Sequence, residues 1–556
     1  MIDQIMQTIK QQLEQQLQFE NVIVERPKRG FSDIAIPLFN LAKHQQKNPK
    51  EVYDKIAETL THPFISKTEF ASGFLNIYLN RKLFSQVVLK TIRTEKEHYG
   101  DQKLTEPQKI ALDYSSPNIA KSFGIGHLRS TVIGHSINLL HQKLGYQTIS
   151  INHLGDWGTQ FGKMIVAYEK WGDEAKLLAS PIEEMQALYV HFHDEAAKNP
   201  DLDQEARDVF KALENNDEKY IKLWQWFKEE SLKEFDRMYT LLNVTFDSND
   251  GESFYNDKMD AVVDELDKKG LLKEDEGATI VDLGDEMPPA LIKRSDGATL
   301  YITRDLAAAI YRYRTYHTKE ILYVVGNEQQ LHFKQLKKVI ELLGYDIEIK
   351  HINFGLLLTD GKKMSTRGGK FKRLEDVVDQ AIELAAKAIK DKNPNLENQH
   401  DTATKVGVGA IVYNDLKNER HLDVDFNLEN MLKFEGQTGP YLQYSSVRME
   451  SILKEHTFDD STIVDHLFQN DHYFEIIKLL AEFPSLLLRA KEQYAPSIIA
   501  KYLMSLAQSF NRFYARERIL VEDKTILNTH LVFIASIQTV LNEGMRLLGM
   551  AILKEM

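Results

Sequence analysis

Short apolar strands alternate with amphipathic helices through the middle of the chain, and this alternation restricts the possible folds more than any other feature of the sequence. The strands are expected at 110–112, 148–151 and 321–325, and two of the helices at 304–316 and 330–344. Strands that alternate with helices favour a parallel, doubly wound sheet with helices on both faces. We therefore predict a Rossmann-like α/β domain within a multidomain chain.

The segments on either side of this domain have a different character. The start of the chain combines helices with a strand at 74–79, which is typical of a small α+β domain. Residues 173–245 are charged and helical, so we predict a helical insertion in the Rossmann-like domain. Towards the end, apolar residues recur at helical spacing, which predicts an all-helical domain. The expected parts are an α+β domain at 1–105, the Rossmann-like domain at 106–370, a helical connection at 371–435 and the all-helical domain at 436–556.

The composition excludes several kinds of site. The chain has no cysteine, and no two histidines stand four residues apart beside an acid, so we expect no disulfide and no zinc site. A net charge of −13 argues against general attraction to nucleic acid but allows a local basic stripe. No apolar run approaches the length of a membrane span, and the first residues do not resemble a secretory signal. These features fit a cytoplasmic protein.

A glycine-containing turn joins the first predicted strand to its helix. The strand ends at Asp113, and the turn contains Gly124, Gly126 and His127. Ligands of open α/β sheets bind at the carboxyl ends of strands, where glycines and a helix N-terminus let the backbone approach a phosphate. His127 can donate a hydrogen bond to such a phosphate. Because the motif is short, a simple tight turn with a histidine cap is the alternative.

A second glycine-bounded segment, residues 361–370, is strongly basic and contains Lys363, Met364 and Ser365. Such a loop can close over a polyphosphate and stabilise the charge that grows as pyrophosphate leaves. The alternative is a solvated basic turn. One motif follows an early strand and the other follows the last strand, which suits one nucleotide site built from two distant parts of the chain.

A third stretch, residues 152–162, contains three glycines and could form a strand-to-helix turn beside the ligand. His153 and Asp156 within it suggest an acid–base pair. A structural histidine satisfied by a neighbour is at least as well supported. Trp157 and Phe161 have the character of core aromatics.

Taken together, these stretches closely resemble the arginyl-tRNA synthetases of the first synthetase class, and the resemblance covers essentially the whole chain. That class carries a His-Ile-Gly-His motif at the first turn, where this chain has Gly124 in place of the first histidine. The phosphate-holding role of that histidine is therefore not carried over. The class motif Lys-Met-Ser-Lys-Ser is matched at its first three positions, and the following Thr366 and Arg367 resemble the arginyl version.

The resemblance implies a nucleotide site with ATP as a substrate and Mg²⁺ entering with it. His127 and Lys363 would be the catalytic residues. The implied ATP-binding residues are Gly124, Gly126, His127, Glu328, Lys363, Met364 and Ser365.

The resemblance also implies a pocket for the side chain of L-arginine. A guanidinium is planar, always charged and best matched by a carboxylate, which Asp305 and also Asp113 would supply. For Asp305 a helix N-cap is the alternative. The sequence Asp296-Gly297 just before it is read as a hairpin turn, and His332 as a structural residue. The implied arginine-binding residues are Asp113, Asn118, Tyr301, Asp305 and Gln329.

The all-helical domain resembles the anticodon-binding domain of the same family, so tRNA(Arg) is the implied partner. Splayed RNA bases stack on aromatic rings and arginine planes. The candidate tRNA-binding residues are Tyr441, Tyr444, Arg448, Phe513, Tyr514 and Arg518, although aromatic residues at helical spacing usually pack in cores. Residues 1–105 resemble the N-terminal addition that touches the tRNA corner, and the family suggests a monomer.

Two other functions stay open from the sequence. A class I synthetase for another amino acid would lack the acidic pocket formed by Asp113 and Asp305. A tRNA-binding paralogue without chemistry, suggested by Gly124, would bind tRNA without charging it.

Overall fold

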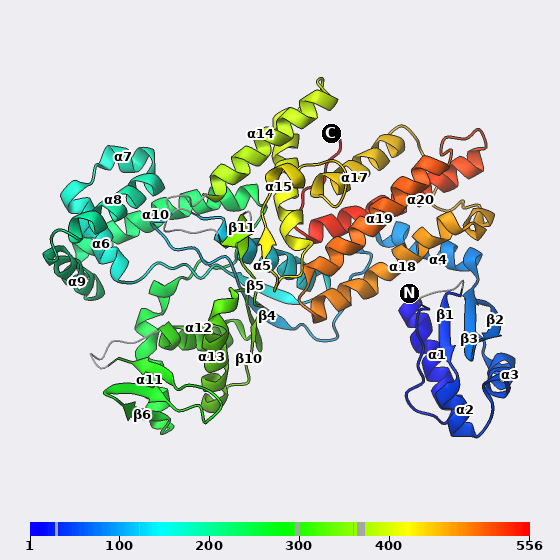
Figure 1. Ribbon diagram of the computed structural model, residues 1–556, viewed down its shortest axis with the longest axis horizontal. Helices are drawn as coiled ribbons and strands as arrows, with labels where there is room; N and C mark the ends of the chain where they lie inside the picture. The colour runs from blue at the N-terminus through cyan, green and yellow to red at the C-terminus, as the bar shows by residue number, and fades with distance from the viewer. Residues whose placement is uncertain (28–31, 122, 295–300, 360, 364–372) are drawn as a thin grey trace.

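The computed structural model describes residues 1–556 except 28–31, 122, 295–300, 360 and 364–372 (Figure 1). Its centre is a four-stranded parallel sheet with the strand order β10-β9-β4-β5. The strands are β4 (Lys109–Asp113), β5 (Gln147–Ile151), β9 (Glu320–Tyr323) and β10 (Glu348–His351). The predicted Rossmann-like sheet is therefore confirmed.

Successive residues of these strands face two separate cores, as the twofold repeat of a strand requires. Ile110 and Leu112 pack in the core that contains α5 (Gly126–Lys143), whereas Ala111 packs in the core that contains α12 (Tyr301–Tyr316) and α13 (Gln330–Leu343). Asp113 ends β4 between Ile151 of β5 and Tyr323 of β9. The chain leaves β4 towards one side of the sheet and β9 towards the other, so Asp113 lies at the switch point where ligands bind such sheets.

A group of helices projects from the sheet on the left of Figure 1. The helical segment predicted at 173–245 corresponds to its last four members. The helices are α6 (Thr159–Trp171), α7 (Glu174–Ala179), α8 (Pro181–Ala196), α9 (Asp201–Glu214) and α10 (Glu218–Leu241).

Below them lie α11 and a small antiparallel sheet that the sequence analysis did not predict. These elements are η2 (Glu252–Lys258), α11 (Met259–Lys268), β6 (Leu272–Asp275), β7 (Ala278–Val281) and β8 (Ala290–Lys293). The predicted turn at Asp296-Gly297 lies outside the described residues.

The start of the chain forms a separate α+β domain at the lower right of Figure 1. Its strands pair in the antiparallel order β1-β3-β2. The elements are α1 (Ile2–Leu17), β1 (Ile34–Pro37), α2 (Phe39–Gln45), α3 (Pro49–Thr59), β2 (Ile65–Ala71) and β3 (Phe74–Leu79). The next helix, α4 (Arg81–Glu95), packs instead against α18 and α20 of the C-terminal helices, because its apolar side chains belong to the same core.

The C-terminal half is helical apart from short strands. Its helices are α14 (Leu374–Lys392), α15 (Gln399–Leu416), α16 (Leu428–Met431), α17 (Gly439–Leu453), α18 (Asp471–Glu492), α19 (Pro496–Arg516) and α20 (Lys524–Leu547). The strands β11 (Leu357–Thr359), β12 (Lys362–Lys363) and β13 (Val424–Asp425) form one small sheet. Within the described ranges, no helix is long and apolar enough to cross a membrane.

Candidate active site

The segment that leaves β4 holds three non-glycine residues in the left-handed region of backbone space. Their φ angles are 74° at Ser115, 50° at Ser116 and 59° at Ala120. Such backbone costs about 1–3 kcal/mol per residue and persists only where its surroundings hold it. Ser115 N donates to Ser130 Oγ at 2.9 Å, and Thr131 Oγ1 donates to Ser115 Oγ at 2.8 Å. The start of α5 therefore holds this turn in a strained shape, as is common at ligand sites.

His127 stands in the first turn of α5, and its ring donates a hydrogen bond to the backbone of Ser115. Burial lowers the pKa of His127 and outweighs the effect of that bond, so the ring is neutral near pH 7. A neutral imidazole has one N–H, so donation to a phosphate requires this ring to exchange its bond with Ser115 or to gain a proton. The preceding Gly126 faces open space, since a Cβ added there would meet nothing within 4 Å. The positive end of α5 is thus accessible to an anion.

The glycine turn pairs through its backbone with residues that follow the basic segment. Gly124 pairs with Arg373 in an antiparallel bridge, and Leu374 N donates to Phe123 O at 2.9 Å. At the other end of the segment, the Lys363 backbone pairs with Leu358 across the β11–β12 hairpin. The chain just after the second motif, from Arg373 on, therefore lies beside the turn that holds the first motif. Only the backbone of Lys363 is described, and Met364 and Ser365 lie outside the described residues.

A buried ion pair joins α5 to the frame of that hairpin. Arg129 is 1% exposed, and its Nε lies 2.9 Å from Oδ2 of Asp415 on α15. Its Nη1 and Nη2 donate to the carbonyls of Leu422 and Arg420 at 2.8 and 3.2 Å. These carbonyls directly precede β13, which pairs with β11. No function was predicted for Arg129 from the sequence, although a charged side chain among the apolar residues of α5 was a signal of such a buried pair.

Asp113 and Asp305 approach one buried cluster from two elements. Asp113 Oδ2 lies 2.8 Å from Nη2 of Arg312 on α12, and Ser116 Oγ donates to Asp113 Oδ1 at 3.1 Å. Asp305 lies one turn inside α12, so the N-cap interpretation is excluded. Its Oδ2 is 2.6 Å from His332 Nε2 of α13.

The two carboxylates also influence the same histidine. Burial lowers the pKa of His153, while Asp113 and Asp305 both act to raise it. Burial raises the pKa of Asp305, but the hydrogen bond from His332 and nearby positive charge outweigh burial, so the pKa is lowered overall. Asp305 is therefore an ionised carboxylate at neutral pH. His153 lies 3.4 Å from Arg312 Nη2 rather than beside Asp156.

The other predicted site residues lie around this cluster at the surface. Tyr301 is 68% exposed at the start of α12, one turn before Asp305. Glu328 and Gln329 are exposed in η3 (Asn327–Gln329), just beyond the end of β9. Asn118 is exposed and pairs through its backbone with Gly155, where an added Cβ would stand 2.2 Å from Asn118 Oδ1.

Asp156 has a structural role, because it binds residues of two neighbouring elements. Its oxygens accept from Ser253 N and Oγ at 2.8 and 2.7 Å, and Lys228 Nζ lies 2.6 Å from Oδ2. Its backbone carbonyl accepts from Trp224 Nε1 at 2.8 Å. These bonds attach the stretch 152–162 to α10 and to η2, so the acid–base interpretation of His153 and Asp156 is not supported.

Three family models match the chain in order. They are described as the arginyl tRNA synthetase N-terminal domain (residues 2–79), the class I (R) tRNA synthetase catalytic domain (88–428) and the DALR anticodon-binding domain (442–556).

The chain belongs to the class I arginyl-tRNA synthetase family. It is 48% identical to the arginine–tRNA ligase of Ligilactobacillus salivarius over 559 residues, which covers 99% of both chains. It is 50% identical to that of Streptococcus pneumoniae (strain Hungary19A-6) over 533 residues, which covers 95% of this chain and 94% of the other. The fold is that of the arginyl-tRNA synthetases of Thermus thermophilus (TM-score 0.82, 22% identity, 100% of each chain) and Plasmodium falciparum (TM-score 0.82, 24% identity, 99% of each chain).

Within this arginyl-tRNA synthetase fold, several of the predicted tRNA-binding residues form one cluster between α17 and α19. Arg448 Cζ lies 4.9 Å from the ring centre of Tyr444 and 5.0 Å from that of Tyr514. Arg448 Nη1 donates to Asn511 Oδ1 at 2.7 Å, and Asn511 Nδ2 donates to the Tyr441 hydroxyl at 3.0 Å. Tyr514 is 40% exposed, which leaves part of its ring free to stack on a base.

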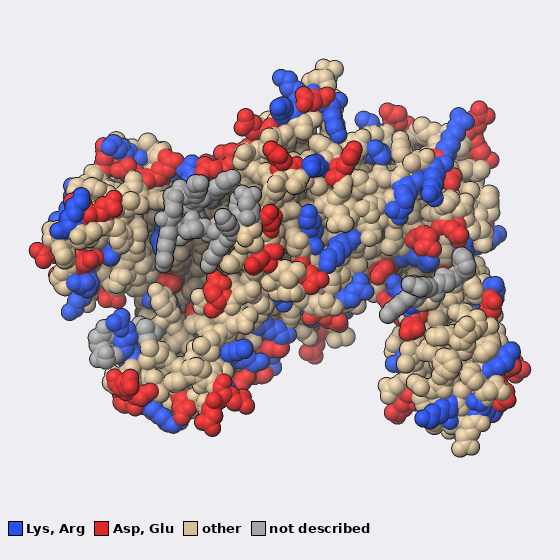
Figure 2. All heavy atoms as spheres, viewed as in Figure 1, with Lys and Arg blue, Asp and Glu red and all other residues tan. Residues whose placement is uncertain are grey.

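Phe513 and Arg518 differ in exposure. Phe513 is 2% exposed and packs against Tyr473 and Phe533, so this ring is a core residue and the sequence-based assignment to tRNA was wrong. Arg518 is exposed just beyond the end of α19. Figure 2 shows Lys and Arg side chains gathering over the outer ends of the C-terminal helices, on a face where both signs of charge are otherwise interspersed.

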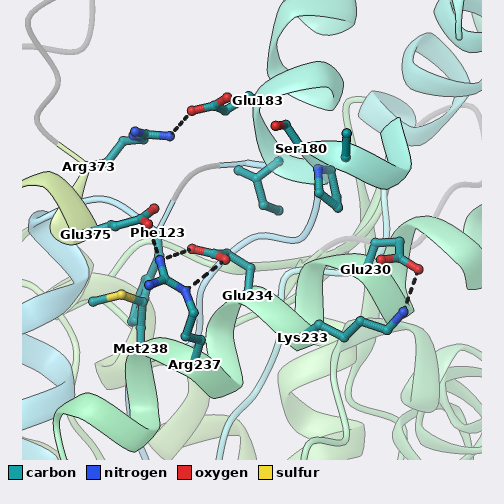
Figure 3. A pocket seen from close by; sticks show the side chains of 13 residues that line it. Phe123, Ser180, Glu183, Glu230, Lys233, Glu234, Arg237, Met238, Arg373 and Glu375 are labelled. Carbon is teal, nitrogen blue, oxygen red and sulfur yellow. Dashed lines mark hydrogen bonds and ion pairs between the residues drawn. The ribbon is translucent and has the colours of Figure 1, made fainter. Parts of the chain in front are cut away.

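A cavity of about 460 Å³ lies between the helical insertion and the start of α14 (Figure 3). Arg237 of α10 binds Glu234 and Glu375, and Lys233 binds Glu230 at 2.8 Å. A further pair joins Arg373 to Glu183 of α8. Each of these lining cations has a carboxylate partner. The ion pairs join the helical insertion to the residues around the start of α14, and none of these cations is left unpaired to bind an anion.

Proposed function

We propose that this chain activates L-arginine with ATP and transfers it to the 3′-terminal ribose of tRNA(Arg). Family membership implies the use of ATP, arginine and tRNA. The observation that carries the assignment to this chain's own residues is the partly buried, ionised carboxylate of Asp305, which together with Asp113 acts on His153 at the end of the strand that leads to α5. This pocket and the N-terminus of α5 stand at one edge of the sheet, which brings the amino acid and the nucleotide together.

In the first step, the arginine carboxylate attacks the α-phosphorus of ATP, arginyl-adenylate forms and pyrophosphate leaves. The N-terminus of α5 and His127 hold the phosphates, with the adjacent Gly124 contributing backbone only. Lys363, Met364 and Ser365 close over the leaving pyrophosphate, and Lys363 stabilises its charge. Catalysis consists of positioning and charge stabilisation, without a covalent enzyme intermediate.

Mg²⁺ enters with ATP, bound by phosphate oxygens. Among the described residues, no group of three or more His, Asp or Glu side chains could hold a metal ion by itself. This donor set suits a cation that arrives already bound to its nucleotide.

In the second step, the 2′-hydroxyl of the terminal tRNA ribose attacks the adenylate carbonyl and AMP leaves. Asn118 and Gln329 hold the amino acid backbone, Tyr301 covers its side chain from the start of α12, and Glu328 binds the nucleotide ribose. Tyr441, Tyr444, Arg448, Tyr514 and Arg518 form the anticodon-side surface, and the N-terminal domain contacts the tRNA corner. We further propose a monomeric, cytoplasmic enzyme, in line with the absence of cysteine.

Substitution of Asp305 tests this function. Tyr301 precedes Asp305 by one turn, so Asp305→Ala removes the carboxylate without altering the exposed start of α12. Charging of tRNA(Arg) with arginine should fall by at least about thirtyfold, because removing a charged partner of a buried ion pair costs about 2–5 kcal/mol. Wild-type protein tested with each amino acid must charge arginine alone, and unchanged arginine use by Asp305→Ala would reject this pocket.

A further inference from the structure

Arg312 is a fully buried cation next to the proposed arginine pocket. It belongs to α12, is 0% exposed, and places Nη2 2.8 Å from Asp113 Oδ2 and 3.4 Å from His153 Nδ1. Its Cζ lies 5.5 Å from the ring centre of Tyr323. Within the described part of the chain, Nε and Nη1 have no acceptor in good hydrogen-bonding geometry, although the Tyr255 hydroxyl also interacts with the guanidinium. Arg312 therefore has Asp113 as its carboxylate partner, at the carboxyl end of β4 where the proposed pocket lies.

Each carboxylate oxygen of Asp113 has one partner among its neighbours. One oxygen faces Arg312, and the other accepts from Ser116 in the strained turn. The carboxylate thereby connects α12 to the segment that leads to His127. Because Arg312 already offsets its charge, Asp113 offers a cationic substrate less net charge than an unpaired carboxylate would.

Asp305 has a different environment. Its hydrogen-bond partner is the imidazole of His332, and His153 is the other imidazole close to it. Neither is a permanent cation, and burial drives His153 towards its neutral form. Among the described residues, Asp113 is paired with Arg312 and Glu252 is paired with Arg304 at 3.2 Å, whereas Asp305 has no lysine or arginine as its ion-pair partner.

We propose that Arg312 is a specificity-determining positioning residue that neutralises and orients Asp113, so that the pocket presents the net charge of one carboxylate to one incoming guanidinium. The proposal rests on the proposed function and replaces the symmetrical acidic pair expected from the sequence. The ligand class that fits is a singly charged, planar cation, and a neutral isostere such as a urea side chain would leave Asp305 uncompensated.

A double-substitution cycle separates this charge balance from direct substrate binding by Asp113. Asp113→Asn alone leaves Arg312 uncompensated beside the pocket, so the KM for arginine should rise by at least about tenfold while the KM for ATP changes little. Adding Arg312→Met removes the excess positive charge, and the KM for arginine should fall back to within about threefold of the wild-type value. If Asp113 instead binds the substrate directly, the double variant stays as impaired as Asp113→Asn.

Two single variants complete the test by tRNA charging with separate titrations of arginine and ATP. Arg312→Lys keeps the charge and should keep the KM for arginine within about threefold of wild type, which a merely steric role would not allow. Arg314→Met, two residues along α12 on the exposed side and paired with Glu265, is the matched control and should change neither KM.

The outcomes are distinguishable. Wild-type protein that does not charge arginine rejects the proposed function itself. Wild-type protein that charges arginine, combined with a double variant that shows no recovery or with equal rises in both KM values, rejects the role of Arg312. Should the double variant fail to fold by thermal melting, Arg312→Lys decides: a rise in the arginine KM of tenfold or more at constant ATP KM overturns the charge argument.

Discussion

Two buried arginine–aspartate pairs serve different purposes in this molecule. In the pair Arg129–Asp415, the two terminal nitrogens of the arginine donate to the backbone carbonyls of Leu422 and Arg420. In the pair Arg312–Asp113, two nitrogens of the arginine have no acceptor within the described residues. Both pairs contain polar atoms without a hydrogen bond, so neither burial nor an unpaired atom marks a site by itself. The pairs differ in what the terminal nitrogens of the arginine meet: two backbone carbonyls for Arg129, and a carboxylate and a histidine at the edge of the sheet for Arg312.

The first pair holds the frame of the enzyme together. It ties α5, whose N-terminus faces the proposed phosphate site, to β13 and through it to the hairpin of the basic segment. The second pair stands at the edge of the sheet where the proposed arginine pocket lies. Substitutions in the first should act on stability, and those in the second on the arginine KM.

The largest effect is expected at the pair Arg129–Asp415, on the stability of the fold. Arg129→Met leaves Asp415 buried without a partner and two carbonyls without donors, so the free energy of unfolding should fall by about 3–5 kcal/mol. Urea unfolding followed by circular dichroism measures this, with Arg314→Met as the exposed control. A loss below about 1 kcal/mol would remove the distinction between the two pairs.

A buried histidine, His135, lies on α5 like Arg129 and should make the stability of the fold depend on pH. Burial lowers the pKa of His135 on α5 from 6.5 to about 4, and neither ring nitrogen has a hydrogen-bond partner in the described structure. The unfolded chain therefore binds this proton first, and stability should fall as the pH drops from 6.5 towards 4, by up to about 3 kcal/mol.

Urea unfolding midpoints across this pH range test the histidine. His135→Leu should flatten the pH dependence, while the exposed His400→Leu should leave it as in the wild type. An unchanged slope in His135→Leu would show that α5 is less tightly packed around this side chain than the structure indicates.

The smallest effect is expected at a third, partly exposed arginine. Arg448 stacks between Tyr444 and Tyr514 and has no carboxylate partner among the described ion pairs. Arg448→Ala should weaken tRNA binding by roughly fivefold, about the value of one cation–π contact, with little change in the unfolding midpoint.

Filter binding of tRNA(Arg) at fixed salt measures this loss. Lys319→Ala, an exposed residue that pairs with Asp346 at the far end of the sheet, is the control for general electrostatics. Equal losses in the two variants would assign the effect to charge alone and not to the aromatic cluster.

Part of the site could be predicted from the sequence because its signals are local. The apolar strand that ends at Asp113 and the glycine turn after it lie within one strand–turn–helix unit, and the structure places His127 at the expected helix start. The same reasoning could not tell which aromatic residues of α19 are buried and which are exposed. Phe513 and Tyr514 are neighbours with similar composition around them, yet packing against α18 and α20 buries the first and exposes the second.

Sequence alone determined the parallel sheet, the order of the motifs along it and the family, since strand and helix periodicity and motif residues are properties of short segments. Tertiary structure alone decided which charges meet. Arg312 and Asp113, like Arg129 and Asp415, come from elements far apart in the chain, and no local pattern specifies their pairing. Coulomb attraction in a buried environment depends on distance and on the loss of water, and both are created only when the cores on the two faces of the sheet close.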